Sequence, residues 1–281
     1  MKKFLSPLLL ISVITMGLFL TSCKDTPTVP SLTEQETNFP SETGNYWVYQ
    51  NILVDKTTKV EDPTQKYIDS VYATEAIYGA NDTIYKHKTT IDVKNEMQLN
   101  ATVINSFKYQ NSKLNADLSY IFPSQVSIFN TMKSFLGGYN LTDMIVIADY
   151  KAILPWVILP EIKFDSINLP ISSYNVKLSN IRYTINGAKG ITTPVVVGTQ
   201  TVNATEFIVT HNIKADAILT VSGIPLNFPI DLNLLIKSYY AKNYGLVKKV
   251  LEPASVAVPV MGTVPLTDGY NTTLLRYNIK Q

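Results

Sequence analysis

The chain has 281 residues, with 24 basic and 22 acidic side chains, two histidines and one cysteine. This near balance of charge, without a dense Lys/Arg cluster, excludes a nucleic-acid binder, which needs a basic face to neutralise phosphates. One cysteine excludes a disulfide within the chain and a cysteine-based zinc site. The 17 tyrosines, together with recurring Val, Ile and Thr, favour β-strands.

The first residues have the pattern of a secretory signal. Lys2 and Lys3 precede an uncharged, mostly apolar run at residues 4–20, and small residues precede Cys23. This arrangement resembles the lipobox of bacterial lipoproteins. The resemblance implies that residues 1–22 are removed and that Cys23 carries the lipid that anchors the chain to a membrane. A transmembrane helix and an ordinary cleaved signal are the alternatives.

The residues after Cys23 predict a polar tether followed by one domain. The tether spans residues 23–38 and includes the sequence Thr-Pro-Thr-Val-Pro-Ser. Lys24 stands where lipoproteins of the inner membrane carry aspartate, so the resemblance favours the outer membrane and leaves the periplasmic or cell-surface face open. Residues 39–281 are long enough to bury a single large core, so we expect one β-rich domain.

Strand patterns begin soon after the tether. Residues 46–51 follow a Thr-Gly-Asn turn, and residues 67–77 and 83–93 predict a hairpin around Gly-Ala-Asn-Asp. Residues 96–109 and 114–122 continue an antiparallel meander.

One helix is predicted in the middle of the chain. Apolar residues recur at helical spacing from Val126 to Leu136, with Ser124 placed to cap the first turn and Gly137 and Gly138 to end the last. Strands resume after it. They are predicted at residues 144–148, 174–186, 194–197, 206–215 and 270–279.

The longest strand pattern lies at residues 224–236. Seven apolar residues alternate there with mostly polar ones, which predicts a strand with one buried and one wet face. Pro225 and Pro229 lack amide donors on the same edge, so an edge strand or a bulge is expected. We expect the apolar face, together with Trp156, to bind an apolar ligand. The seven residues are Ile224, Leu226, Phe228, Ile230, Leu232, Leu234 and Ile236.

Two uncharged segments, residues 153–160 and 253–267, do not alternate, and their prolines exclude a helix interior. They are interpreted either as irregular segments packed over the core, or as loops that line an apolar pocket or contact the bilayer surface. The order of all elements predicts an antiparallel sheet with a minor helical part.

Three short motifs are similar to those of a group of Gram-negative outer-membrane lipoproteins to which no activity is assigned. Phe39 and Pro40 precede Gly-Asn-Tyr-Trp-Val-Tyr at residues 44–49, Val-Val-Val-Gly-Thr lies at residues 195–199, and Gly-Leu-Val-Lys lies at residues 245–248. The resemblance implies a mainly β fold, a strongly curved antiparallel sheet with a minor helical element, like the half-barrels of lipoprotein carriers. It implies no activity.

Few features of the sequence suggest catalysis. His87 and His211 are the side chains that titrate near neutral pH, and both lie in strand patterns, where a packed core histidine is the plain interpretation. His-Glu-x-x-His, Gly-x-Ser-x-Gly, phosphate-loop and dinucleotide motifs are absent from the sequence. A triad assembled across the fold and a pair of glycosidase carboxylates stay open. We expect no enzyme activity, catalytic residue, metal or cofactor.

The sequence thus predicts a membrane-anchored, non-enzymatic binding module for an apolar ligand such as a lipid or an acyl chain. Its expected partners are the membrane, through lipidated Cys23, and a lipid or an envelope protein, but no nucleic acid. One alternative is a structural or assembly component that binds an envelope protein through the same apolar surface. The other is a glycan-binding module, in which aromatic side chains such as Trp47 and Trp156 stack on sugars.

Overall fold

The computed structural model describes residues 39–40, 43–78, 83–92, 102–123, 127–136, 138–171, 174–221, 224–258 and 262–279. Cys23 and the predicted tether lie outside these ranges, as do Ser124 and Gly137 at the ends of the predicted helix. The division into signal, tether and one domain therefore stays a prediction.

The described chain is mainly β, with two short helical segments. The first eight strands are β1 (Tyr46–Val54), β2 (Glu61–Tyr78), β3 (Thr83–Asp92), β4 (Thr102–Gln110), β5 (Lys113–Asp117), β6 (Met144–Asp149), β7 (Trp156–Ile171) and β8 (Tyr174–Val197). The others are β9 (Gln200–Val221), β10 (Ile224–Ala241), β11 (Gly245–Leu251), β12 (Ala254–Val258), β13 (Gly262–Thr267) and β14 (Gly269–Asn278). The helical segments are the 3-10 helix η1 (Leu118–Ile121) and α3 (Ser127–Phe135).

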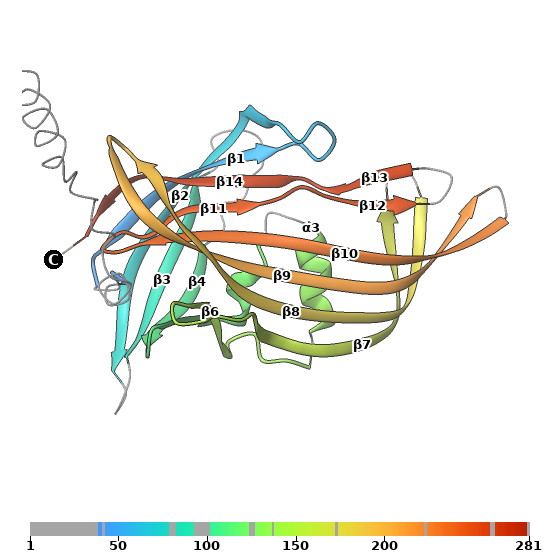
Figure 1. The fold of residues 1–281 in the computed structure, drawn as a ribbon, viewed down its shortest axis with the longest axis horizontal. Helices are drawn as coiled ribbons and strands as arrows, with labels where there is room; N and C mark the ends of the chain where they lie inside the picture. Colours follow the sequence, from blue (N-terminus) through green and yellow to red (C-terminus); the bar gives the residue numbers. More distant parts are fainter. Residues whose placement is uncertain are drawn as a thin grey trace, which may run out of the picture.

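Twelve of these strands form one antiparallel sheet that curves around an apolar interior and nearly closes on itself (Figure 1). Across the sheet the order is β6-β5-β4-β3-β2-β1-β14-β11-β10-β9-β8-β7, and β12 and β13 form a separate hairpin. The first and last strands, β1 and β14, therefore lie side by side. The predicted mainly β fold with a curved antiparallel sheet and a minor helical element is confirmed.

The alternation at residues 224–236 is confirmed along most of β10. Its inward side chains are buried from Phe228 to Tyr240, and every residue of the strand is paired with β9. Ile224, predicted to be buried, is 64% exposed, because it lies at the tip of the β9–β10 hairpin beyond the core. On its other side, β11 pairs only with residues 236–241. The part that contains Pro225 and Pro229 is therefore an open edge, as predicted.

Other segments differ from the prediction. Residues 174–186 and 194–197 belong to one continuous strand, β8. The strand predicted at residues 114–122 ends at Asp117, whose carboxylate accepts hydrogen bonds from the backbone N–H of Ser106 at 2.6 Å and the side-chain amide of Asn105 at 3.1 Å. These bonds hold the chain at the point where it leaves the sheet and enters η1.

The two uncharged segments are not alike. Within residues 253–267, β12 and β13 pair as antiparallel strands whose buried side chains pack on the core, so the irregular backbone expected there is wrong for these two strands and the packing is right. In the other segment, Ile153 and Leu154 are 96% and 77% exposed, and β7 begins at Trp156. None of the helices in the described part of the chain has the length and apolar content of a membrane span.

Helix α3 lies in the concave interior of the sheet (Figure 1). Phe129, Met132 and Leu136 are buried there, and the Phe129 ring meets the His211 ring of β9 edge-on at 4.8 Å. One part of the interior is thus filled by the helix.

The two edge strands of the sheet, β6 and β7, share no backbone ladder. The indole Nε1 of Trp156 on β7 instead donates a hydrogen bond to the carbonyl of Val146 on β6, at 2.9 Å. Gly187, opposite Trp156 on β8, leaves room for the indole, since a Cβ at this position would lie 2.1 Å from the ring. A side chain therefore joins the edges where backbone pairing is absent.

Candidate functional site

The residues predicted to bind an apolar ligand lie mainly in the packed core. Phe228, Ile230, Leu232, Leu234 and Ile236 belong to one cluster of buried side chains, whereas Leu226 is half-buried. Their ligand-binding role stays a prediction, as does that of Ile224 and Trp156. None of them lines the cavity that the structure contains elsewhere in its interior.

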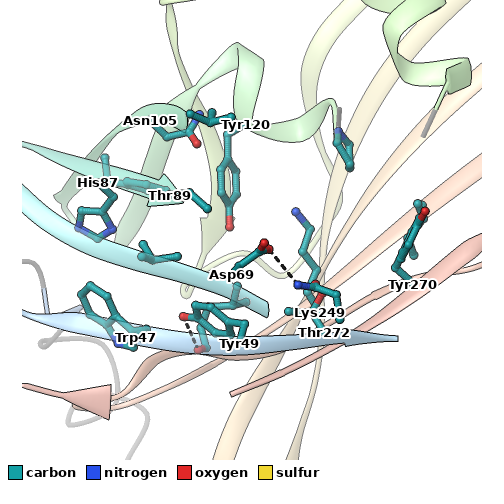
Figure 2. Close-up of a pocket in the computed structure, with 18 of the residues that line it drawn as sticks. Trp47, Tyr49, Asp69, His87, Thr89, Asn105, Tyr120, Lys249, Tyr270 and Thr272 are labelled. Carbon is teal, nitrogen blue, oxygen red and sulfur yellow. Dashed lines mark hydrogen bonds between the residues drawn. The ribbon is translucent and has the colours of Figure 1, made fainter. Parts of the chain in front are cut away.

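This cavity has a volume of about 240 Å³ and lies within the curve of the sheet (Figure 2). Side chains from β1, β2, β3, β4, β10, β11 and β14 form its walls, and side chains of η1 and Lys133 of α3 also line it. Its volume is just below the range of about 300–1,000 Å³ that is usual for small-molecule sites. Figure 2 shows Trp47 and His87 at one end, Tyr270 at the other and Asp69 between them.

One end of the cavity is an aromatic wall, formed by Phe39, Trp47, His87, Phe107 and Tyr240. The His87 ring lies between the others, with its centroid 5.2 Å from that of Trp47, 4.7 Å from Phe107 and 5.9 Å from Phe39. Burial lowers the pKa of His87 to about 4, so the ring is neutral at neutral pH. Its Nε2 is buried and has no hydrogen-bond partner among the described residues.

A polar row crosses the floor of the cavity over four neighbouring strands, and it consists of Asp69, Asn51, Thr272 and Lys249. Asn51 lies opposite Thr272, and Thr272 lies opposite Lys249. The amide Nδ2 of Asn51 donates to Asp69 at 2.9 Å, and the Thr272 hydroxyl donates to the Asn51 Oδ1 at 2.5 Å. The other carboxylate oxygen of Asp69 is buried and has no partner in the described structure.

Burial changes the pKa of both charged residues in the polar row. It raises the pKa of Asp69 to about 6, against the opposing effects of the Asn51 hydrogen bond and the Lys249 charge. It lowers the pKa of Lys249 to about 8, against the attraction of Asp69. Lys249 Nζ also lies 4.8 Å from the centroid of the Tyr120 ring. Buried ionisable groups cost stability, and they gather where a protein binds or reacts.

The structure places the two predicted histidines in different settings. His211 is fully buried and shares a 2.6 Å hydrogen bond between its Nδ1 and the Tyr183 hydroxyl, and burial lowers its pKa to about 3. It is a packed core histidine, as predicted, whereas His87 is buried but also lines the cavity. The described residues contain no group of three His, Cys, Asp or Glu side chains able to hold a metal ion.

The tryptophans do not form an open platform for sugars. Trp47 is 2% exposed and donates its Nε1 to the carbonyl of Tyr244 at 2.8 Å. Trp156 is half-buried against Gly187 at the join between the sheet edges. The stacking suggested for Trp47 as an alternative is therefore wrong, since its faces lie inside the protein.

Sequence reasoning missed Asp69 and Lys249. Asp69 shares the inward parity of Tyr67 and Val71 on β2, and Lys249 follows Lys248 in a Lys-Lys pair in which alternation turns one side chain inward. A charged residue at an inward position of a strand is the signal that would have indicated a buried polar site.

No protein-family model and no curated protein matches the chain. Two solved structures are distantly similar to it. A "putative lipoprotein" from Parabacteroides distasonis has 10% sequence identity and a TM-score of 0.45, and the match covers 85% of this chain and 97% of that one. A "putative exported protein with YmcC-like fold" from Bacteroides fragilis has 9% identity and a TM-score of 0.40, with 85% and 98% covered.

Proposed function

We propose that this protein is a non-enzymatic binding module that holds a lipid or an acyl chain inside its curved sheet, and that lipidated Cys23 anchors it to the outer membrane. The observation that carries the proposal is the cavity of about 240 Å³, with its aromatic wall and its polar row. The anchor rests on the lipobox resemblance around Cys23.

The cavity is favoured over the apolar face of β10 as the ligand site, because the cavity has space for a ligand and the β10 face is packed. Leu234 has no exposed surface and Ile236 almost none, so a ligand would have to displace side chains there. Protein interiors are close-packed, and side chains that line a void lose dispersion contacts on that side. An apolar ligand in the cavity restores those contacts for the aromatic wall.

The arrangement of the polar groups favours binding over catalysis. Asp69, Asn51 and Thr272 form a static chain of hydrogen bonds. The His87 ring is stacked among other rings, and its Nε2 meets no hydroxyl or carboxylate in the described structure. A nucleophile that is activated by an adjacent base needs such a contact.

A matched pair of variants tests the proposal. Val71 lines the cavity, so Val71→Phe reduces its volume, whereas Val196→Phe makes the same change on an exposed face of β8. The full-length proteins are purified from membranes and extracted with organic solvent, and the extracts are analysed by mass spectrometry. We expect a stoichiometric amphiphile with the wild type and with Val196→Phe, and a strong loss with Val71→Phe. An extract without amphiphile from all three, and no saturable uptake of an added acyl chain, would overturn the proposal.

A second candidate is a component that binds an envelope protein at the open edge of β10. Strand addition at an exposed edge is a common mode of recognition, and among the described residues, 224–234 form no backbone ladder on that side, although β12 contacts β10. Pro225 and Pro229 remove two amide donors from the same edge, which is how natural sheets block such pairing. Replacing both prolines by threonine is expected to increase cross-linking to an envelope partner if this candidate is right, and to leave it unchanged if it is wrong.

A further inference from the structure

The side chains that line the cavity carry more positive than negative charge. Among the described residues that line it, Lys133 and Lys249 are cationic and Asp69 is acidic, while His87 is neutral at neutral pH. Burial raises the pKa of Tyr120, so this phenol is also neutral. The cavity therefore has an excess of positive charge, in a setting where protein rather than water surrounds the charges.

Lys249 stands at the end of the polar row without an ion pair. Ion pairs within 4.0 Å in the described chain join other lysines, such as Lys237 with Glu252 and Lys214 with Asp231, and none includes Lys249. Asp69 attracts Lys249, although one Asp69 oxygen accepts from Asn51 and the other has no hydrogen-bond partner among the described residues. The ammonium of Lys249 thus retains donors that no described residue accepts, although part of the side chain stays accessible.

The surroundings of Lys249 select the kind of ligand. A neutral ligand leaves the lysine charge buried without a counter-ion, which is costly, and a cationic ligand is repelled by two lysines. An anion gains charge-assisted hydrogen bonds from the ammonium. The aromatic wall at the other end of the cavity requires an apolar body.

We propose, on the basis of the proposed function, that the ligand is a single-chain amphiphile with an anionic head. Its head pairs with Lys249 at the polar row, and its chain lies against the aromatic wall of Trp47, His87 and Phe107. A carboxylate and a phosphate monoester share this chemistry, so a fatty acid and an alkyl phosphate are the two sources to be distinguished.

Four probes with the same ten-carbon chain test the head group, and the modest cavity volume favours a chain of this length. They are decanoate, decyl phosphate, 1-decanol and decyltrimethylammonium. Full-length protein in phosphatidylcholine nanodiscs is dialysed to equilibrium against each probe, with empty nanodiscs as the blank. We expect decanoate, decyl phosphate or both to bind at least tenfold more tightly than decanol, and the cationic probe to bind most weakly. The preferred anion identifies the source.

Three variants at two neighbouring lysines supply the controls. Lys249→Met is expected to abolish the preference for the anion, because decanoate then loses the ammonium that pairs with its head, and urea unfolding shows that the variant is folded. Lys249→Arg keeps the charge and is expected to keep the preference. Lys248 points to the other face of β11, where it lies 5.4 Å from the Tyr239 ring, so Lys248→Met is expected to behave as the wild type.

The outcomes separate the two proposals. Equal binding of decanoate and decanol, or an anion preference that Lys249→Met retains, overturns the anionic head and leaves the apolar-ligand module standing. Absence of binding by all four probes overturns the proposed function itself.

Discussion

The buried His87 predicts a specific dependence of stability on pH. Its pKa is about 4 in the folded protein, below the ordinary value of 6.5, because burial opposes the charged form. Above pH 6.5 the ring is neutral in both the folded and the unfolded chain. Between pH 6.5 and about 4 the unfolded chain binds a proton that the folded chain does not, so the free energy of unfolding falls as the pH is lowered. Below about pH 4 this loss is complete.

The substitution His87→Phe isolates this effect. At pH 4.5, two units below the unfolded pKa, the loss due to His87 is about 2.5 kcal/mol relative to pH 7, at roughly 1.4 kcal/mol per unit and with partial protonation of both states at the ends of the range. Phenylalanine keeps a ring between Trp47 and Phe107 but does not titrate. The variant is therefore expected to lose about 2.5 kcal/mol less than the wild type between pH 7 and 4.5.

Urea unfolding at both pH values, followed by far-ultraviolet circular dichroism, measures the difference. The pKa of His211 is also lowered, so its titration likewise reduces the free energy of unfolding as the pH falls. The pKa of Asp69 is raised to about 6, so its titration increases the free energy of unfolding as the pH falls, because the fold favours its protonated form. Both residues are present in the two proteins, so their contributions cancel in the comparison. Losses that agree within about 0.5 kcal/mol would refute the reasoning that His87 is buried in its neutral form.

Three further predictions follow from other parts of the structure. Gly187→Ala drives a Cβ into the Trp156 ring and is expected to cost about 1–3 kcal/mol, with a red shift of tryptophan fluorescence; unchanged emission would contradict it. Leu234→Ala is expected to cost about 2–5 kcal/mol in urea unfolding, whereas Ile224→Ala, at an exposed tip, is expected to change stability by less than about 0.5 kcal/mol; equal costs would contradict the core placement. Decanoate affinity is expected to fall between pH 7 and 9 as Lys249 loses its proton near pH 8, and Lys249→Arg is expected to remove this dependence; a parallel fall in both would contradict it.

Local periodicity predicted the parts of the fold that a single segment determines. The two-residue alternation of β10 and the helical spacing of α3 are properties of neighbouring residues, so they can be read without knowing the partners. The open edge at Pro225 followed in the same way from the missing amide donor.

The candidate site depends on pairing between segments far apart in the sequence. Asn51 and Lys249 become neighbours of Thr272 because β14 lies between β1 and β11. No local pattern fixes that strand order, because it results from how the whole sheet closes. Periodicity therefore favours the most regular apolar face as a ligand site, which the core of the folded protein fills, and gives no indication of the irregular polar row.

The join between β6 and β7 differs from the other seams of the described sheet, because side chains and not a backbone ladder connect the two strands. A ladder of backbone hydrogen bonds would have to break over several residues before strands could part. Here side chains span the gap: the Trp156 indole donates to Val146, and Lys189 of β8 donates to the Tyr150 carbonyl next to β6, each bond contributing about 0.5–1.5 kcal/mol. Separating β6 from β7 would therefore leave every paired strand of the described sheet intact.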